Sequence, residues 1–220
     1  MLTLNNMGLT LGKRSTNIFD GQDERRNIMK LSVRTICMVA MFTAIISVLS
    51  IMQIPTPWGV PFTLQTFAMA LCGYVLGWKY GTLSTVLYIL IGAIGVPVFA
   101  GMSAGVGILT GATGGYLFGF IIMTFLCGIG RVYMKKGAKG IVWLVAFSAL
   151  GLAACHILGI IQLKYVANLS WAVAAIKGSV PYLAKDIASV IGAYLVALAI
   201  RRALRSTNLL DWENEKKAHA

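Results

Sequence analysis

The chain has 220 residues, of which 58% are apolar and 12% are charged, and its formal net charge is +12. A soluble domain carries about 25% charged residues, so the composition excludes a soluble catalytic domain and indicates a surface that faces lipid. The basic residues lie in several separate segments rather than in one patch, which argues against nucleic-acid binding.

The N-terminal segment, residues 1–28, is polar and has no helical apolar period, so we expect a disordered extension. The phrase that begins at Met29, Met-Lys-Leu-Ser-Val-Arg-Thr, is typical of a natural start just before a first membrane helix. We therefore predict a membrane domain over residues 29–205, followed by a cytoplasmic tail over residues 206–220.

Three long stretches, residues 35–78, 80–130 and 140–163, contain no Asp, Glu, Lys or Arg. A spanning helix needs about 20 apolar residues, so the first two stretches each accommodate two helices and a loop. They are apolar throughout, whereas strands of a membrane barrel alternate apolar and polar residues. The predicted fold class is an all-α membrane protein with six transmembrane helices, over residues 35–54, 63–78, 82–99, 110–130, 141–161 and 180–200.

The basic residues predict how these helices are oriented, because cytoplasmic loops of membrane proteins are rich in Lys and Arg. Six helices place both termini on one side, and all but three of the 19 basic residues belong to segments on that side. The exceptions are Lys164, Lys177 and Lys185. We expect both termini to be cytoplasmic in a multi-pass protein of the cell (plasma) membrane.

The predicted loop after the first helix, residues 54–65, is uncharged and rich in proline and aromatic residues. Its prolines restrict φ and stiffen it. Such a loop suits a lid over a partly apolar ligand. It equally suits a loop that lies on the membrane interface, where Trp is common, and the loop alone leaves both readings open.

Glycine is concentrated in residues 95–116. Glycine permits positive φ and close approach of the backbone, and irregular backbone at membrane depth is tolerated only inside protein or beside a cavity. We expect this segment to line a pocket.

Small residues four apart in sequence allow helices to pack closely. Such spacing occurs at Gly73, Gly77 and Gly81, at Gly111, Gly115 and Gly119, and at Ala40 and Ala44. For Ala40 and Ala44, contact with a partner subunit is the alternative to packing within the chain.

Asp186 is the only acidic residue of the predicted membrane domain. A carboxylate at the centre of a membrane helix costs about 2.5–3.5 kcal/mol and is a functional candidate for that reason. Here it either accepts hydrogen bonds from a ligand or stabilises a helix N-terminus beside Lys185. His156 is the only histidine of the domain, and a lone histidine in a helix is more often a hydrogen-bonded structural residue than a ligand.

The sequence contains no His-Glu-x-x-His, Gly-x-Ser-x-Gly or P-loop motif. The four cysteines lack Cys-x-x-Cys spacing. We therefore expect no catalytic residues, no metal ligands and no cofactor. Any active transport must draw its energy from an ion gradient or from another subunit.

Four phrases of the membrane domain resemble one known family in order and spacing: Val-Pro-Phe-Thr-Leu-Gln at 60–65, Gly-Ala-Ile-Gly-Val-Pro-Val-Phe-Ala-Gly at 92–101, Gly-Ala-Thr-Gly-Gly-Tyr-Leu-Phe-Gly-Phe at 111–120, and Pro-Tyr-Leu-Ala-Lys-Asp at 181–186. The region from about Met29 to Arg202 resembles BioY, the biotin-binding S component of energy-coupling factor (ECF) transporters.

This resemblance implies the six-helix S-component fold with a pocket near the outer face, and high-affinity biotin binding and uptake. It implies as partners an ECF transmembrane coupling protein and two ATPase subunits in the lipid bilayer, with Ala40 and Ala44 contacting the coupling protein. Biotin is then the transported ligand. The alternatives are an S component for another vitamin, a membrane-embedded enzyme and a structural subunit.

Biotin has two ureido N–H donors, a ureido carbonyl, an apolar bicyclic body and a carboxylate. A buried carboxylate can accept a ureido N–H, and aromatic side chains can cover the body. The family often has a lysine three residues after the aspartate, and this chain has Ser189 there. Lys185 and Lys177 are therefore the candidates to bind the biotin carboxylate. A second departure is Ala112, which stands where the family commonly has a proline. The expected substrate-binding residues are Trp58, Phe62, Thr63, Gln65, Phe99, Gly101, Thr113, Tyr116, Lys185 and Asp186.

Overall fold

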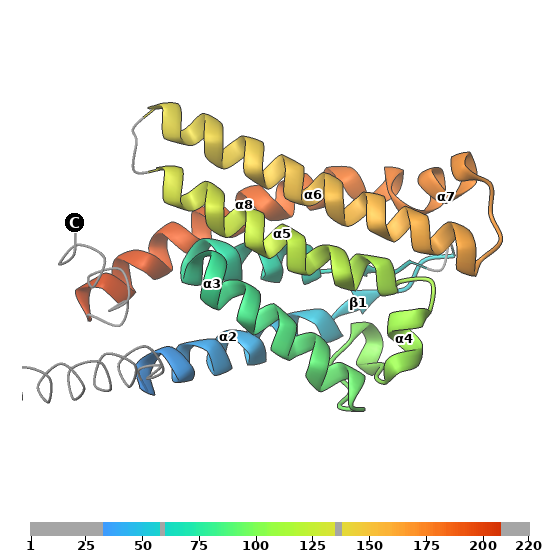
Figure 1. The fold of residues 1–220 in the computed structure, drawn as a ribbon, viewed down its shortest axis with the longest axis horizontal. Coiled ribbons are helices and arrows are strands. Elements are labelled where there is room, and N and C mark those ends of the chain that lie inside the picture. The colour runs from blue at the N-terminus through green and yellow to red at the C-terminus, as the bar shows by residue number, and fades with distance from the viewer. Residues whose placement is uncertain (1–32, 58–59, 135–137, 208–220) are drawn as a thin grey trace, which may run out of the picture. The chain divides into compact units, whose positions relative to one another are not determined.

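The structure, a computed structural model, describes residues 33–57, 60–134 and 138–207. The chain forms two units, Met1–Ile36 and Cys37–Ala220, and the description below concerns the second. The predicted extension over 1–28 and nearly all of the predicted tail lie outside the described residues. The elements are α2 (Val33–Ile51), β1 (Gln53–Ile54), β2 (Phe62–Thr63), α3 (Gln65–Ala93), the 3-10 turn η1 (Ala100–Met102), α4 (Val106–Thr110), α5 (Gly114–Tyr133), α6 (Ala138–Val166), α7 (Trp171–Gly178) and α8 (Val180–Ser206) (Figure 1).

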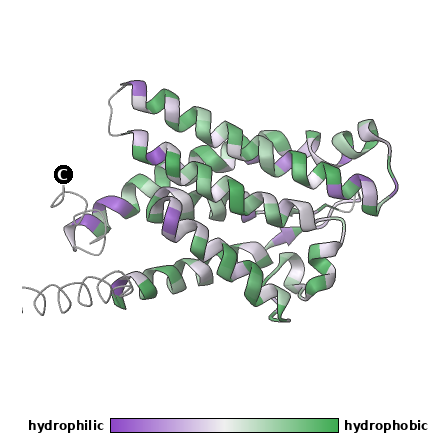
Figure 2. Ribbon diagram, viewed as in Figure 1, coloured by the Kyte–Doolittle hydropathy of each residue, from purple (hydrophilic) through white to green (hydrophobic). Residues whose placement is uncertain are grey.

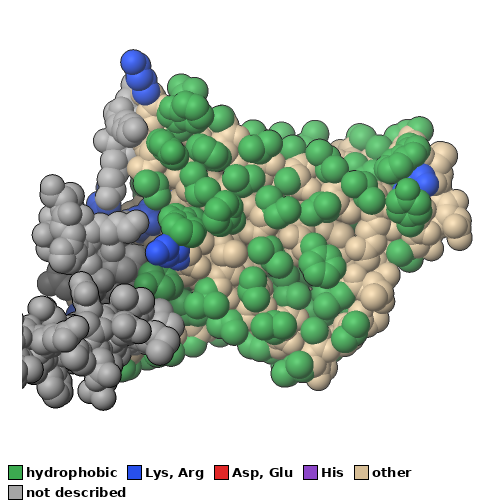
Figure 3. Space-filling model, viewed as in Figure 1, with side chains coloured by type: hydrophobic (Ala, Val, Ile, Leu, Met, Phe, Trp, Pro, Cys, Tyr) green, Lys and Arg blue, Asp and Glu red, His purple; other side chains and the backbone are tan. Residues whose placement is uncertain are grey.

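The prediction of a helical membrane protein is confirmed. In the described part of the chain, five helices are long and apolar enough to cross a membrane: α2, α3, α5, α6 and α8. Hydrophobic residues extend along these helices (Figure 2). Large apolar side chains such as Val142, Leu150 and Leu195 are exposed. Hydrophobic side chains cover much of the face shown in Figure 3. An apolar surface of this extent is suited to lipid contact.

Helix α3 covers two of the predicted spans because it folds back on itself. Gly77 has φ 81° and ψ −178°, which is not helical. The Thr85 hydroxyl donates a hydrogen bond to the sulfur of Met69 over 3.5 Å, although the two residues are 16 apart in sequence. In a straight helix that separation is about 24 Å. The predicted loop between spans two and three is therefore a reversal at Gly77.

Glycines allow the helices to pack closely, as the fourfold spacing predicts. A Cβ on Gly73 would lie 2.5 Å from the backbone oxygen of Thr124 on α5. A Cβ on Gly119 would lie 2.6 Å from the Cα of Cys155 on α6. The packing prediction therefore holds for Gly73 and Gly119, whereas Gly77 forms the reversal of α3 and Gly111 meets only its own segment.

Several short elements at one end of the helices were not predicted. Residues 94–99, which were expected to be helical, lie beyond the end of α3, and Phe99 instead pairs with Ser103 in an isolated β-bridge. Two-residue strands β1 and β2 pair antiparallel, with Gln53 opposite Thr63. Ser170 accepts a hydrogen bond from the backbone N–H of Val173 and so begins α7. These elements are too short to give a periodic signal.

Candidate functional site

A cavity of about 240 Å³ lies among the short elements and the adjoining ends of the long helices. A single water needs far less room than this, so the space suits a small molecule. Its apolar wall includes Val60, Phe99, Ile108, Tyr116, Leu117, Phe120 and Leu152. Its polar wall includes Gln53, Thr63, Gln65, Thr66, Ser103, Thr113, His156, Lys185 and Asp186.

The β1–β2 hairpin is fastened over the cavity by contacts with α8. The Tyr182 hydroxyl donates to the backbone oxygen of Val60 and lies 3.1 Å from the hydroxyl of Thr56. The ring of Phe62 packs on Tyr182 with centroids 4.7 Å apart. Val60, Pro61 and Thr63 of this loop line the cavity, which favours the interpretation that the loop faces a ligand, and Phe62 lies outside the lining.

The end of β2 and the start of α3 bring two polar side chains, Thr63 and Gln65, to the cavity wall. The backbone N–H of Gln65 donates to the Thr63 hydroxyl over 3.3 Å, and that hydroxyl donates to Gln65 Oε1 over 3.1 Å. Gln65 Nε2 donates to the Tyr88 hydroxyl over 2.9 Å. These bonds fix the amide, and a fixed polar group costs less entropy when a ligand binds to it.

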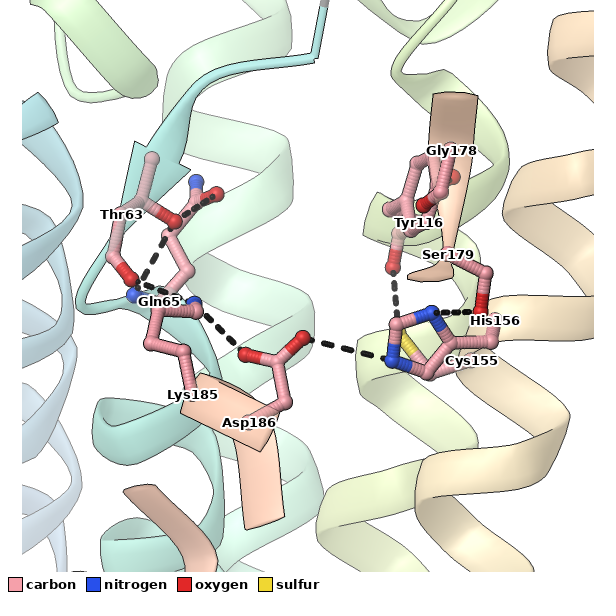
Figure 4. Close-up of polar contacts among 9 residues, drawn as sticks. All are labelled: Thr63, Gln65, Tyr116, Cys155, His156, Gly178, Ser179, Lys185 and Asp186. Carbon is pink, nitrogen blue, oxygen red and sulfur yellow. Dashed lines mark hydrogen bonds and ion pairs between the residues drawn. The ribbon is translucent and has the colours of Figure 1, made fainter. Parts of the chain in front are cut away.

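Asp186 is the centre of the polar wall (Figure 4). Its side chain is buried, and the ammonium of Lys185 lies 2.6 Å from Oδ1. The Nε2 atom of His156 lies 3.3 Å from Oδ2. Asp186 belongs to the second turn of α8, which begins with a proline in its first turn. A buried carboxylate of this kind requires charged or hydrogen-bonding partners, and both partners come from the cavity wall.

Both partners of Asp186 are themselves held in place. Lys185 Nζ donates to the backbone oxygen of Thr63 over 2.9 Å. His156 Nδ1 lies 3.1 Å from the hydroxyl of Ser179. A chain of polar contacts therefore joins the hairpin, α8 and α6 across the cavity (Figure 4).

The Asp186 carboxylate can accept more hydrogen bonds than its two partners supply. Oδ1 is buried and lies 2.6 Å from the Lys185 ammonium, and Oδ2 faces His156. An ionised carboxylate offers about four lone-pair sites, and Asp186 lines the cavity. The carboxylate can therefore accept a further N–H from a ligand.

The cavity brings together most of the predicted site residues but not all of them. Phe62 and Gly101 do not line it, and Trp58 lies outside the described residues. Gly101 adopts φ 65° and packs against Gln53, where a Cβ would lie 2.0 Å from Nε2. The predicted residues that line the cavity are Thr63, Gln65, Phe99, Thr113, Tyr116, Lys185 and Asp186.

His156 is hydrogen-bonded as predicted, since its side chain contacts Asp186 and Ser179. It also lines the cavity, a position that the sequence did not indicate. Of the two candidate lysines, Lys185 lines the cavity and Lys177 does not. In the part of the chain that the structure describes, no group of three or more His, Cys, Asp or Glu side chains is arranged to hold a metal ion.

A second predicted contact surface lies on α2. Met38, Phe42 and Ile46 are buried on one side of this helix, and Ala40 and Ala44 are exposed. Within the described chain these alanines therefore do not serve internal packing. They form a small-residue stripe, which is a surface that a partner helix can approach closely.

Comparisons with known proteins agree on one relationship. A model of the BioY family matches residues 23–206. The chain is 39% identical over 171 residues to the biotin transporter BioY of Thermotoga maritima, covering 77% of this chain and 97% of the relative. It is 34% identical to the biotin transporter BioY2 of Lactococcus lactis, covering 79% and 93%. It is similar, with TM-score 0.67 and 27% identity over 79% of this chain and 92% of the other, to a crystal structure of the S-component for biotin from an ECF-type ABC transporter.

Proposed function

Since the chain belongs to the BioY family, we propose that it captures biotin in the cavity around Asp186 and is the biotin-specific S component of an ECF-type ABC transporter. The observation that carries this proposal is the Asp186 carboxylate, a buried acceptor that is held by Lys185 and His156 and lines a cavity of small-molecule size. A ureido N–H can bond to the lone pairs that these two partners leave unused.

The cavity chemistry matches biotin group by group. A charge-assisted hydrogen bond from a ureido N–H to Asp186 contributes about 1.5–3 kcal/mol. The bicyclic body fits against the apolar wall that includes Phe99, Tyr116 and Leu117. Lys185 has three N–H donors, and the contacts to Thr63 and Asp186 use two of them. The third is the candidate donor for the biotin carboxylate, since Ser189 and Lys177 do not line the cavity.

In the proposed topology the chain crosses the plasma membrane six times. Both termini lie in the cytoplasm. The two arms of α3, which reverse at Gly77, supply the second and third passes. Lys164 and Lys177 then lie outside, and the basic residues at the ends of α5 and α8 lie inside. Single cysteines at Lys177 and Arg202 test this, because an impermeant thiol reagent added to intact cells should label only the first.

The proposed partners are an ECF transmembrane coupling protein and two ATPase subunits. The sequence has no P-loop, so the ATPases supply the energy and this chain carries no catalytic activity of its own. The exposed stripe of Ala40 and Ala44 on α2 is the proposed contact with the coupling protein. In this arrangement the chain binds biotin and the partners drive its release into the cytoplasm.

Calorimetric titration of the detergent-purified protein tests the function directly. Biotin, thiamine and riboflavin are titrated in parallel. Saturable one-to-one binding of biotin alone supports the proposal. Folded protein that binds thiamine or riboflavin instead of biotin would assign the same cavity to another vitamin, and folded protein that binds none of them would refute the capture role.

A further inference from the structure

A second cavity, of about 260 Å³, lies near the ends of α5 and α8, away from the proposed biotin site. Four arginines line it, together with the aromatic rings of Tyr74 and Tyr194 and the apolar side chains of Met134, Ala197 and Leu198. The arginines are Arg131, Arg201, Arg202 and Arg205. None of these residues is used by the proposed biotin function.

Arg201 is a buried part of the cavity wall and is held by hydrogen bonds to the backbone. Its side chain is 8% exposed, and Nη1 donates to the backbone oxygens of Val75 over 2.5 Å and Tyr74 over 3.5 Å. These carbonyls belong to the turn just before Gly77, where the helical geometry of α3 is interrupted. Carbonyls at such an interruption lose their helical partners, so Arg201 satisfies them and is held at the cavity.

The charge in this region favours an anion. Four guanidinium groups line one cavity. Guanidinium groups bind phosphate oxygens in a planar, two-pronged geometry. Arg131, Arg201 and Arg205 have further interactions of their own, so a phosphate binds beside those contacts or replaces them.

The apolar part of the wall indicates which phosphate compound fits. Tyr74 and Tyr194 meet edge to face with centroids 5.6 Å apart, and the Tyr194 hydroxyl contacts the sulfur of Met134 at 2.8 Å. Leu198 adds apolar surface beside them. A fully hydrated free phosphate gains nothing from such a wall, whereas the glycerol and upper acyl chain of a lipid do.

We propose that this arginine cavity binds the phosphate of an anionic phospholipid headgroup. Basic cavities between the ends of spanning helices are suited to anionic headgroups. Under the proposed topology the cavity faces the cytoplasmic leaflet, and only this assignment of the leaflet depends on the proposed function. The occupant that competes with lipid is the acidic segment that contains Asp211, Glu213 and Glu215, which lies outside the described residues.

The test is native mass spectrometry of the full-length protein with phosphatidylglycerol and with phosphatidylcholine of identical acyl chains. We expect one retained phosphatidylglycerol and no retained phosphatidylcholine. The double variant R202Q/R205Q should weaken phosphatidylglycerol binding about tenfold, because it removes two charge-assisted contacts. The control K79Q/K139Q removes the same charge outside the cavity lining and should leave binding within about twofold.

Four results would overturn the proposal. The first is equal retention of the two lipids, and the second is equal loss in R202Q/R205Q and in the control. The third is phosphatidylglycerol that binds only after D211N/E213Q/E215Q, which would identify the acidic segment as the occupant. Full displacement of lipid by inorganic phosphate would also overturn it in favour of a free phosphate site. Titration of the same samples with biotin distinguishes failure of the proposed lipid site from failure of the proposed biotin function.

Discussion

The Nε2 atom of His156 on α6 lies 3.3 Å from Oδ2 of Asp186 on α8, and both residues belong to the polar wall of the proposed biotin cavity. The imidazole and the Lys185 ammonium hold the two oxygens of one carboxylate from opposite sides (Figure 4). Because both partners line the cavity, substitutions at any of the three residues should change ligand binding.

Replacing Asp186 with asparagine should weaken biotin binding by about tenfold or more, because the loss of a charge-assisted hydrogen bond costs at least ~1.4 kcal/mol. Asparagine has nearly the same shape, so the thermal unfolding temperature should change little. Calorimetry measures the affinity, and a fluorescence melt in detergent checks the fold. An affinity equal to that of the unsubstituted protein would remove Asp186 from the ligand contacts.

Replacing His156 with alanine should weaken biotin binding by about 1–2 kcal/mol, since Oδ2 of Asp186 loses its partner and becomes less well positioned. The control is Ser179→Ala, which removes the contact to the far side of the imidazole and should have a smaller effect. Equilibrium binding of labelled biotin compares the two variants. Equal losses in both would mean that the effect of the histidine depends on its orientation by Ser179, and unchanged binding in His156→Ala would contradict the prediction.

Replacing Lys185 with glutamine tests whether the Lys185 ammonium binds the carboxylate of biotin. If Lys185 binds the biotin carboxylate, the unsubstituted protein should prefer biotin to its methyl ester by about tenfold, and Lys185→Gln should lose this preference. Lys177→Gln is the matched control, because Lys177 does not line the cavity. A preference that persists in Lys185→Gln and disappears in Lys177→Gln would reverse the assignment.

Replacing Gly73 with alanine should destabilise the fold by about 1–3 kcal/mol, because the added methyl group overlaps the backbone of α5 and the helices must move apart. Its Cβ would lie 2.5 Å from the Thr124 oxygen. Gly107→Ala is the control, because nothing lies within 4 Å of the Cβ position there. Thermal unfolding in detergent should separate the two variants, and similar melting temperatures would show that the contact relaxes without cost.

Replacing Ala40 and Ala44 with leucine should abolish biotin uptake while leaving biotin binding unchanged. Both residues are exposed on α2, so larger side chains cost the fold little but prevent close approach of a partner helix. Uptake is measured in cells that supply the coupling protein and the ATPases, and binding is measured on purified protein. The control is Ala199→Leu on the exposed side of α8. Normal uptake in the α2 variant would move the partner contact elsewhere.

The long helices and much of the cavity could be predicted from the sequence because each depends on local signals. Charge-free stretches give the helices, and the motifs that carry the family resemblance contain Thr63, Gln65 and Asp186, all of which line the cavity. Two features could not be predicted in this way. The reversal of α3 depends on one glycine at φ 81°, and the role of His156 depends on contacts between α6 and α8.

Phe62 and Gly101 were predicted to line the cavity and do not, because the direction of a side chain depends on the fold. Phe62 is next to Thr63 in a strand, where successive side chains point to opposite faces; Thr63 lines the cavity and Phe62 packs on Tyr182. Gly101 is in the correct segment, but its backbone turns against Gln53. In both places the sequence indicates the segment correctly, and only the fold determines which of its side chains reach the cavity.

Helix α8 contributes residues to both cavities. It carries Asp186 near its first turn and Arg201 near its last, and a rise of 1.5 Å per residue separates them by about 22 Å. Because the helix is continuous between them, a shift of α8 along its axis that displaces Asp186 also displaces Arg201 from the carbonyls before the reversal of α3. The proposed biotin site and the arginine cavity at the opposite end therefore share one structural element.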